Sequence, residues 1–179
     1  GTSIFTNKED LLILLGLMNS KVILKVLELI SPTLNYEVGH ISSVPIIKNG
    51  NKIDTNELIK LVKENIKISK VDWDSFEISW EFKKHPFLNF TTETVKSAYK
   101  HWKEFVKSQY SQLMQNEEEI NRLFIEVYDL EAELSPHVEE KEVTISKADL
   151  ERDIKSFISY AVGCMFGRYS LDEEGLIYA

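Results

Sequence analysis

The pattern of apolar residues predicts helices from the start of the chain. Thr6 and Glu9 have the spacing of a capping box, and a dense apolar series follows them: Leu11, Leu12, Leu14, Leu15 and Met18. A second apolar stripe runs from Val22 to Ile30, after a break at Asn19–Ser20 and before Pro32. We therefore expect a buried helix and then a second, amphipathic one.

Between residues 34 and 47 this periodicity is lost. Gly39, Pro45 and the short run Val44–Ile47 favour an irregular segment that holds an edge strand or an extended connector. The polar run Lys48–Asn51 then predicts a turn.

A third helix is expected after Asp54 and Glu57, which repeat the capping pattern. The apolar positions behind them keep the helical period to about Ser69. The stretch from Val71 to Leu88 holds two of the three tryptophans and fits neither the helical nor the strand period. We expect it to be irregular.

The strongest helical signal lies between Thr92 and Leu130. Its apolar positions alternate spacings of four and three, as in the seam of a coiled coil: Val95, Tyr99, Trp102, Val106 and Leu113. The polar run Asn116–Glu119 either restarts the helix or lies within it. One long rod and a helical hairpin are both compatible with this pattern.

A last helix is predicted after the acidic loop Glu139–Glu142. Ser146 and Asp149 have the capping spacing, and apolar positions continue from Leu150 to Met165. Gly163 and Gly167 allow close packing or an ending. The expected fold is mainly α: a helical bundle with a long coiled-coil-like helix or helical hairpin and small irregular or extended segments.

Length and composition favour one helical domain over residues 1–179. With 43% hydrophobic residues the chain can bury one real core, but it is short for two. Its single cysteine, Cys164, excludes an internal disulfide and suits a reducing, cytoplasmic setting. The run Leu11–Met18 is too short to span a bilayer. Since the chain begins at Gly1, we interpret it as a piece cut from a longer protein.

Net charge restricts how the chain could bind nucleic acid. With 21 Lys and Arg against 29 Asp and Glu the net charge is -8, which disfavours free-standing DNA binding. Two local rows could still follow phosphates along a groove, each on one helical face: Lys60, Lys63, Lys67 and Lys70, and then Lys96, Lys100, Lys103 and Lys107. Solvated faces opposite a core would show the same pattern.

The residues give no complete catalytic, cofactor or metal site. The four prolines are isolated and no glycine-rich loop follows a predicted strand, so neither a base-gripping motif nor a nucleotide cradle can be assigned. The histidines are too scattered for a metal site: His40, His85, His101 and His137. Cys164 lies on an apolar helix and is expected to be buried and inert.

An alternative chemistry is Mg²⁺-dependent phosphodiester cleavage. Asp72 and Asp74, followed by Glu81–Lys83, give an acid, acid and lysine pattern that can bind the metal and position water. The pattern needs a pair of strands to be productive, whereas this sequence looks helical. Surface charges between tryptophan anchors explain it better.

Three long runs resemble PglX, the family of adenine-specific DNA methyltransferases of BREX phage-exclusion systems. They are Leu17–Lys21 with Ser31–Gly39, Asp72–Phe76 with Trp80–Pro86, and Ser159–Asp172. The first run also resembles the close of a recognition-type region in restriction-modification enzymes. The resemblance implies a parent protein that methylates adenine at N6 with S-adenosylmethionine and so marks host DNA.

Because the family's catalytic and cofactor motifs are absent here, no catalytic residue is carried over. We expect a non-catalytic helical scaffold or spacer in the parent, between its catalytic and target-recognition parts. Its parts would be a two-helix tail of the recognition-type region (1–48), a helix with an aromatic segment (54–90), the long helix or hairpin (91–134) and the last helix (146–179).

The expected partners are the rest of the parent chain and, through it, double-stranded DNA. A second hypothesis is a protein-interaction module that docks the parent onto other defence-system proteins through the aromatic region Trp73–Phe90. A Mg²⁺-dependent nuclease is the third.

Overall fold

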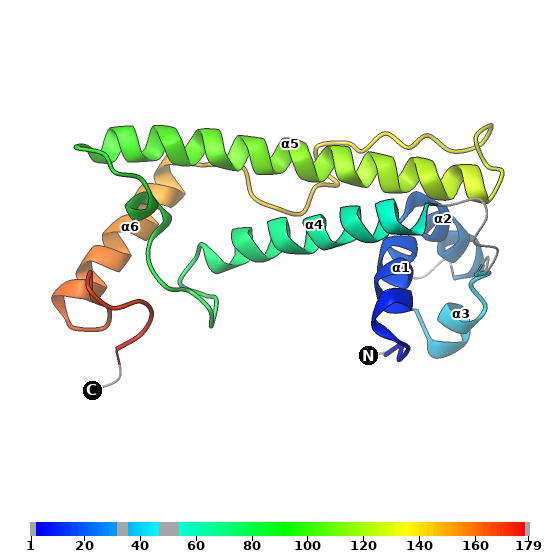
Figure 1. The fold of residues 1–179 in the computed structure, drawn as a ribbon, viewed down its shortest axis with the longest axis horizontal. Helices are drawn as coiled ribbons and strands as arrows, with labels where there is room; N and C mark the ends of the chain where they lie inside the picture. Colours follow the sequence, from blue (N-terminus) through cyan, green and yellow to red (C-terminus); the bar gives the residue numbers. More distant parts are fainter. Residues whose placement is uncertain (1–2, 32–35, 47–53, 178–179) are drawn as a thin grey trace. The chain divides into compact units, whose positions relative to one another are not determined.

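The computed structural model describes residues 3–31, 36–46 and 54–177 (Figure 1). These residues form helices and no strand, which confirms the mainly α fold: α1 (Lys8–Met18), α2 (Lys21–Ile30), α3 (Val38–Ser42), α4 (Thr55–Asp74), the 3-10 helix η1 (Pro86–Asn89), α5 (Val95–Val127) and α6 (Leu150–Met165). No helix in the described ranges has both the length and the apolar character to cross a membrane.

Helix α5 is a single element of 33 residues, so the prediction of one long helix is confirmed and the prediction of a helical hairpin is wrong. The polar run that left the question open lies inside the helix. Asn116 is buried there, and its amide donates to Asn65 Oδ1 of α4 at 2.9 Å. Beyond Val127 the helix is closed by Asp129, whose φ of 52° is left-handed. The Leu130 N–H then donates to the Ile125 carbonyl at 3.0 Å, as at a Schellman end.

The chain divides into two compact units. Unit 1 comprises residues 1–66 and 113–142, and unit 2 comprises residues 67–112 and 143–179. Helices α4 and α5 are each continuous from one unit into the other. That the two units behave as one folding domain, as length and composition suggest, stays a prediction.

Unit 1 has one continuous apolar core. Gly16 allows the close packing of α1, because an added Cβ would lie only 2.9 Å from a Val62 methyl of α4. Apolar residues that recur along one face of α5 form one side of this core. The buried members are Leu17, Val22, Ile23, Leu27, Val44, Leu58, Val62, Ile120, Leu123, Phe124 and Ile125.

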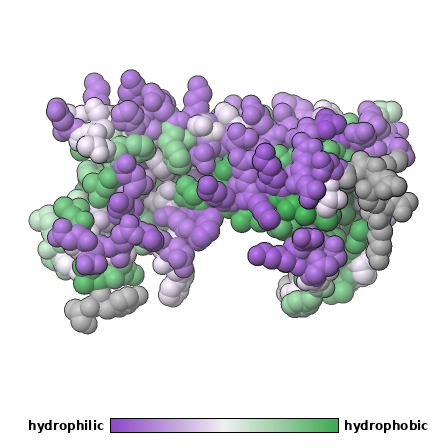
Figure 2. All heavy atoms as spheres, in the orientation of Figure 1, coloured by the Kyte–Doolittle hydropathy of each residue, from purple (hydrophilic) through white to green (hydrophobic). Residues whose placement is uncertain are grey.

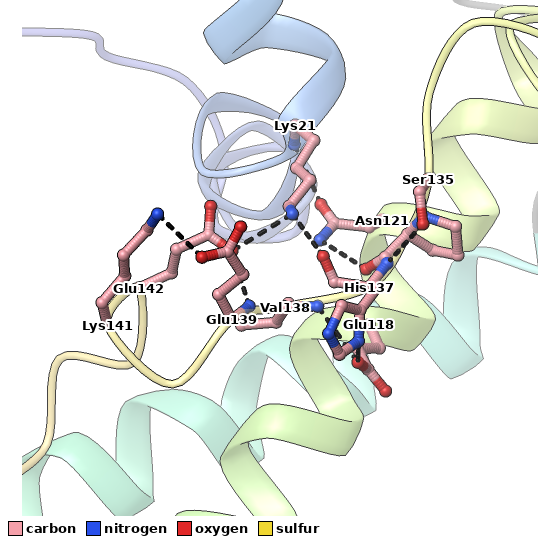
Figure 3. A network of polar contacts seen from close by, with 10 residues as sticks. Lys21, Glu118, Asn121, Ser135, His137, Val138, Glu139, Lys141 and Glu142 are labelled. Atoms are coloured by element: carbon pink, nitrogen blue, oxygen red, sulfur yellow. Dashed lines mark hydrogen bonds and ion pairs between the residues drawn. The ribbon is translucent and has the colours of Figure 1, made fainter.

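A polar network fastens the segment after α5 to α2 and α5 (Figure 3). Lys21 forms an ion pair with Glu142 at 3.1 Å and donates to the His137 carbonyl. Glu118 accepts from the Val138 N–H at 3.0 Å and contacts the His137 ring. The hydrogen bond from Val138 lowers the pKa of Glu118, so its carboxylate stays charged and able to hold this segment.

The start of α2 is capped by a residue distant in sequence. Ser20, at the N-cap position, makes no side-chain capping bond. Instead the buried Asn121 of α5 accepts from the Lys21 N–H at 2.9 Å, and its amide donates to the Pro136 carbonyl at 3.2 Å. One side chain therefore satisfies both the first donor of α2 and a carbonyl of the returning segment.

Replacing Asn121 by leucine is expected to lower the free energy of unfolding by about 2 kcal/mol, because the part-buried N–H of Lys21 and the part-buried C=O of Pro136 lose their partner. Gln115→Leu makes the same chemical change at an exposed position of α5 and should cost well under 1 kcal/mol. Urea unfolding monitored by circular dichroism gives both values. Equal losses in the two variants would contradict the capping role.

Unit 2 is held by aromatic clusters on α5, η1 and α6. One contains Phe87, Ala98, Trp102 and Val106, and the other contains Phe82, Tyr160 and Tyr169. His85 is 2% exposed and joins them, with its ring centroid 4.5 Å from that of Phe87 and 6.3 Å from that of Tyr160. Its Nδ1 accepts from the Phe87 N–H at 3.3 Å and caps η1.

A buried carboxylate fixes α6 to α5 within unit 2. Asp153 is 2% exposed and accepts from Trp102 Nε1 at 3.0 Å and from the Asp149 N–H at 3.1 Å. Arg152 supplies the countercharge through its Nε, 2.8 Å from the carboxylate. The Asp153 carboxylate therefore gives the Trp102 indole N–H a hydrogen-bond acceptor inside an apolar cluster.

Helix α6 ends as its glycines predict. At Gly167 φ is +74°, and the Arg168 N–H donates to the Gly163 carbonyl at 2.8 Å. Gly163 lies against Tyr169, where an added Cβ would be 2.7 Å from the ring.

Several expected boundaries are wrong. The segment 34–47 contains the short helix α3, which begins at a capping box between Glu37 and His40. Helix α4 continues through residues 71–74, and η1 lies in the rest of the stretch expected to be irregular. Of the two alternatives for the run Val44–Ile47, the connector is confirmed over residues 44–46 and the edge strand is wrong there, while Ile47 lies outside the described residues.

The helix starts also differ from the expected capping boxes. Asn7 and Asp149 provide the N-caps of α1 and α6, in place of Thr6 and Ser146. Leu11 and Leu15 of α1 are 45% and 41% exposed, so this helix is only partly buried. Pro32 and the predicted turn at 48–51 lie outside the described residues.

Candidate nucleic-acid interface

The lysine row of α5 is exposed on one face of the helix in unit 2. Lys96, Lys100, Lys103 and Lys107 are spaced by four, three and four residues, which keeps them in line. The opposite face is buried through Ala98, Trp102 and Val106. Hydrophilic side chains accordingly cover the outer side of this part of α5 (Figure 2).

The charges of this row are not neutralised by neighbours. Among the described residues none of the four lysines forms an ion pair, whereas lysines elsewhere on the chain do. The first turn of α5 carries no acidic residue, although acids are the stabilising choice at the positive end of a helix dipole. The exposed lysines and the positive end of the helix dipole therefore favour an anion at the start of α5, while Glu93 before the helix and Glu104 within it carry the opposite charge.

The dimensions of the row suit a phosphate backbone. From Lys96 to Lys107 it extends about 16 Å along the helix axis. A DNA strand carries a charge about every 3.4 Å of duplex axis, so the row can reach several phosphates of one strand. Such contacts position a protein on DNA without reading its sequence.

The lysine row of α4 is a weaker candidate. Lys60, Lys63, Lys67 and Lys70 are all exposed, but the first two belong to unit 1 and the last two to unit 2. Lys70 is paired with Asp74 at 2.8 Å, and this hydrogen bond raises the pKa of the lysine. One charge of the row is thus already compensated.

The net charge is distributed unevenly between the units. Unit 1 contains 9 Lys and Arg against 17 Asp and Glu, whereas unit 2 contains 12 of each. The whole excess of -8 is therefore in unit 1, and the α5 row belongs to a neutral unit. The charge argument against DNA binding accordingly applies to unit 1 and not to unit 2.

The aromatic region between α4 and α5 is divided between core and surface. Phe82 and Phe87 are buried, whereas Trp80 is 100% exposed, Ile78 68% and Trp73 55%. All three exposed side chains belong to unit 2.

The residues of the nuclease pattern have separate structural partners. Asp74 binds Lys70 and Ser79, and Lys83 forms an ion pair with Glu174 at 2.8 Å. Burial raises the pKa of Asp72, which lies on α4 and not on a strand. Over the described residues, no group of three or more His, Cys, Asp and Glu side chains could hold a metal ion.

The single cysteine is not fully buried, contrary to expectation. Cys164 is half-buried beside the cluster of Phe82, Tyr160 and Tyr169. Burial and the neighbouring thiol raise the pKa of Tyr160 to about 12, so this phenol stays neutral.

No model of a known protein family matches the chain. Over its whole length, however, the chain is similar to one segment of adenine-specific methyltransferases. It is 41% identical over 185 residues to the adenine-specific methyltransferase PglX of Lacticaseibacillus casei (strain Zhang). It is 36% identical over 197 residues to the adenine-specific methyltransferase BrxX of Escherichia coli O9:H4 (strain HS).

Each alignment covers all of this chain but only 15% of PglX and 16% of BrxX. The chain thus corresponds to a segment of the PglX and BrxX methyltransferases, and the resemblance found from the sequence is confirmed.

Proposed function

We propose that this chain is a non-catalytic helical scaffold of a site-specific adenine N6 DNA methyltransferase that marks host DNA in bacterial phage defence. It links the catalytic and target-recognition parts of that enzyme, and its α5 lysine row contacts the DNA backbone. The similarity to PglX and BrxX over the whole chain supports the parent activity. The unpaired lysines of α5 are the observation that supports DNA contact.

The continuity of α5 supports the scaffold role. A helix of 33 residues is about 50 Å long, and α5 contributes buried residues to a core cluster within each unit. An element of this kind can keep two parts of an enzyme at a fixed separation, which a flexible linker cannot do.

Methyl transfer from S-adenosylmethionine is assigned to other parts of the parent. A nucleotide cofactor is commonly held by a glycine-rich turn between a strand and a helix, and the described residues of this chain include no strand. We assign no residue here to the cofactor or to the base. Adenine methylation by the 179-residue chain alone, with cofactor and DNA supplied, would contradict the scaffold role.

The DNA contact is tested in the full-length methyltransferase. Changing Lys96, Lys100, Lys103 and Lys107 together to glutamine should weaken DNA binding and reduce the slope of log K against log salt by about three to four, at about 0.9 per lost phosphate contact. The loss should be the same for DNA with and without the target sequence, because backbone contacts carry no sequence information. Fluorescence anisotropy at several salt concentrations measures the slope.

A matched control removes four other exposed lysines, each of which has an acidic partner: Lys25, Lys83, Lys141 and Lys155. It changes the net charge equally and should leave the slope nearly unchanged. If the two variants lose the same slope, overall charge explains the effect and the α5 row has no specific role.

The second candidate is docking to other defence-system proteins through Trp73–Phe90. The exposure of Trp80, Ile78 and Trp73 favours it. Trp80→Ser with Ile78→Ser would then abolish binding of a partner subunit while the salt dependence of DNA binding stays unchanged. The lysine variant would show the opposite behaviour.

A further inference from the structure

Helix α6 is apolar on two opposite faces. Its inner face packs within unit 2 through Tyr160, which is 2% exposed, and Phe157. Over the second half of the helix, its outer face bears apolar residues that unit 2 leaves uncovered: Ile158 at 56% exposure, Val162 at 44%, Met165 at 83% and the adjoining Phe166 at 85%. The three helical positions are spaced by four and three residues, so they form one stripe, which the exposed ion pair of Glu151 and Lys155 separates from Leu150.

The outer face of α6 contrasts with that of α5. Where α5 turns lysines outward, the last ten residues of α6, from Ser156 to Met165, carry no charge at all. Hydrophobic atoms are accordingly visible at the surface around α6 (Figure 2). A surface helix normally has a polar outer side, and a helix that is apolar all round belongs inside a protein.

The length of the relatives is the argument for what covers this stripe. PglX and BrxX align with the chain over only 15% and 16% of their own lengths, so more than four-fifths of such a polypeptide lies outside the structure. A patch that is permanently covered by the same polypeptide needs no polar side chains for solubility.

We propose that the outer stripe of α6, formed by Ile158, Val162, Met165 and the adjoining Phe166, is the surface on which another part of the same methyltransferase polypeptide packs. The proposal rests on the proposed function only in that the chain belongs to a longer methyltransferase. It assigns α6 as an internal domain interface and α5 as the side that faces DNA.

Cysteine accessibility tests the interface. In a Cys164→Ala background, Met165→Cys and Ile158→Cys are introduced one at a time, and the rate of modification by a maleimide is measured in the full-length methyltransferase and in the 179-residue chain. Ser111→Cys is the control, because Ser111 is an exposed polar position on α5 of the same unit. We expect modification at 158 and 165 to be at least tenfold slower in the full-length protein, and modification at 111 to be equally fast in both.

Equal rates at 158 and 165 in the two proteins would overturn the proposal. Slow modification in the 179-residue chain that becomes faster on dilution would also overturn it, because a second copy would then cover the stripe. The labelling needs no DNA and no activity. The two proposals can therefore fail separately. If the α6 cysteines are protected in the full-length protein but the lysine variant keeps the salt slope of the unchanged protein, only the DNA contact is contradicted.

Discussion

Replacing Asp153 by alanine is expected to lower the free energy of unfolding of the chain by about 3 kcal/mol. The carboxylate accepts from Trp102 Nε1, from the Asp149 N–H and from Arg152. Without it the indole N–H stays buried among apolar groups with no acceptor, and Arg152 loses its countercharge. Removing one partner of a buried pair costs more than the pair contributes, because the other partner stays desolvated.

Two further variants separate the causes. Asp153→Asn keeps an oxygen acceptor for Trp102 but removes the charge beside Arg152, so its loss should be smaller. Glu151→Ala removes an exposed carboxylate of α6 that pairs with Lys155, and it should cost less than 1 kcal/mol.

Urea unfolding by circular dichroism measures all three variants, and a single transition is expected because α4 and α5 run through both units. If Asp153→Ala lowers the free energy of unfolding by less than 1 kcal/mol, the hydrogen bonds to the Asp153 carboxylate do not stabilise unit 2. Two separate transitions would contradict the single folding domain.

The buried His85 is expected to make the chain lose stability in mild acid. Burial disfavours the imidazolium and lowers the pKa of His85 to about 4, from 6.5 in the unfolded chain. Above pH 6.5 both states hold a neutral ring. Between pH 6.5 and 4 only the unfolded state takes up the proton, so stability falls as the pH falls, by about 3 kcal/mol over the whole window.

The variant His85→Asn isolates this contribution. Asparagine can still accept from the Phe87 N–H but does not titrate, so stability between pH 6.5 and 4 should change less steeply than in the unchanged chain. The comparison is needed because Glu117 acts in the opposite direction: burial raises its pKa to about 6, which favours the folded state as the pH falls from 6 to 4.5. Parallel stability curves for the two proteins would exclude His85 as the cause.

The long helix was predictable because its signal is local. The alternating spacing of Val95, Tyr99 and Trp102 requires only that one face be buried, and the same spacing returns at Ile120 and Leu123. Whether the helix passes through Asn116 was not predictable, because Asn116 gains its partner from Asn65 of α4. The exposure of the lysine rows was implied for the same local reason, while their contact with DNA stays a prediction.

The errors have different causes. Residues 71–74 are helical, and the Ser75 hydroxyl donates to the Val71 carbonyl at the end of α4; apolar periodicity does not reveal this local bond. His85 gave no signal in sequence except as one of four scattered histidines, yet its buried ring packs against Phe87 and Phe157 in unit 2. At α1 and α6 two neighbouring polar residues could each cap the helix, and only the backbone decides between them.

The cap that Asn121 provides for α2 also has a consequence for biosynthesis. The two residues of this bond are 100 positions apart, so the first donor of α2 has no protein acceptor until most of the chain has left the ribosome. During translation α1 and α2 would emerge as nascent, fraying helices with exposed leucines. They should then depend on chaperones until α5 emerges and completes their core.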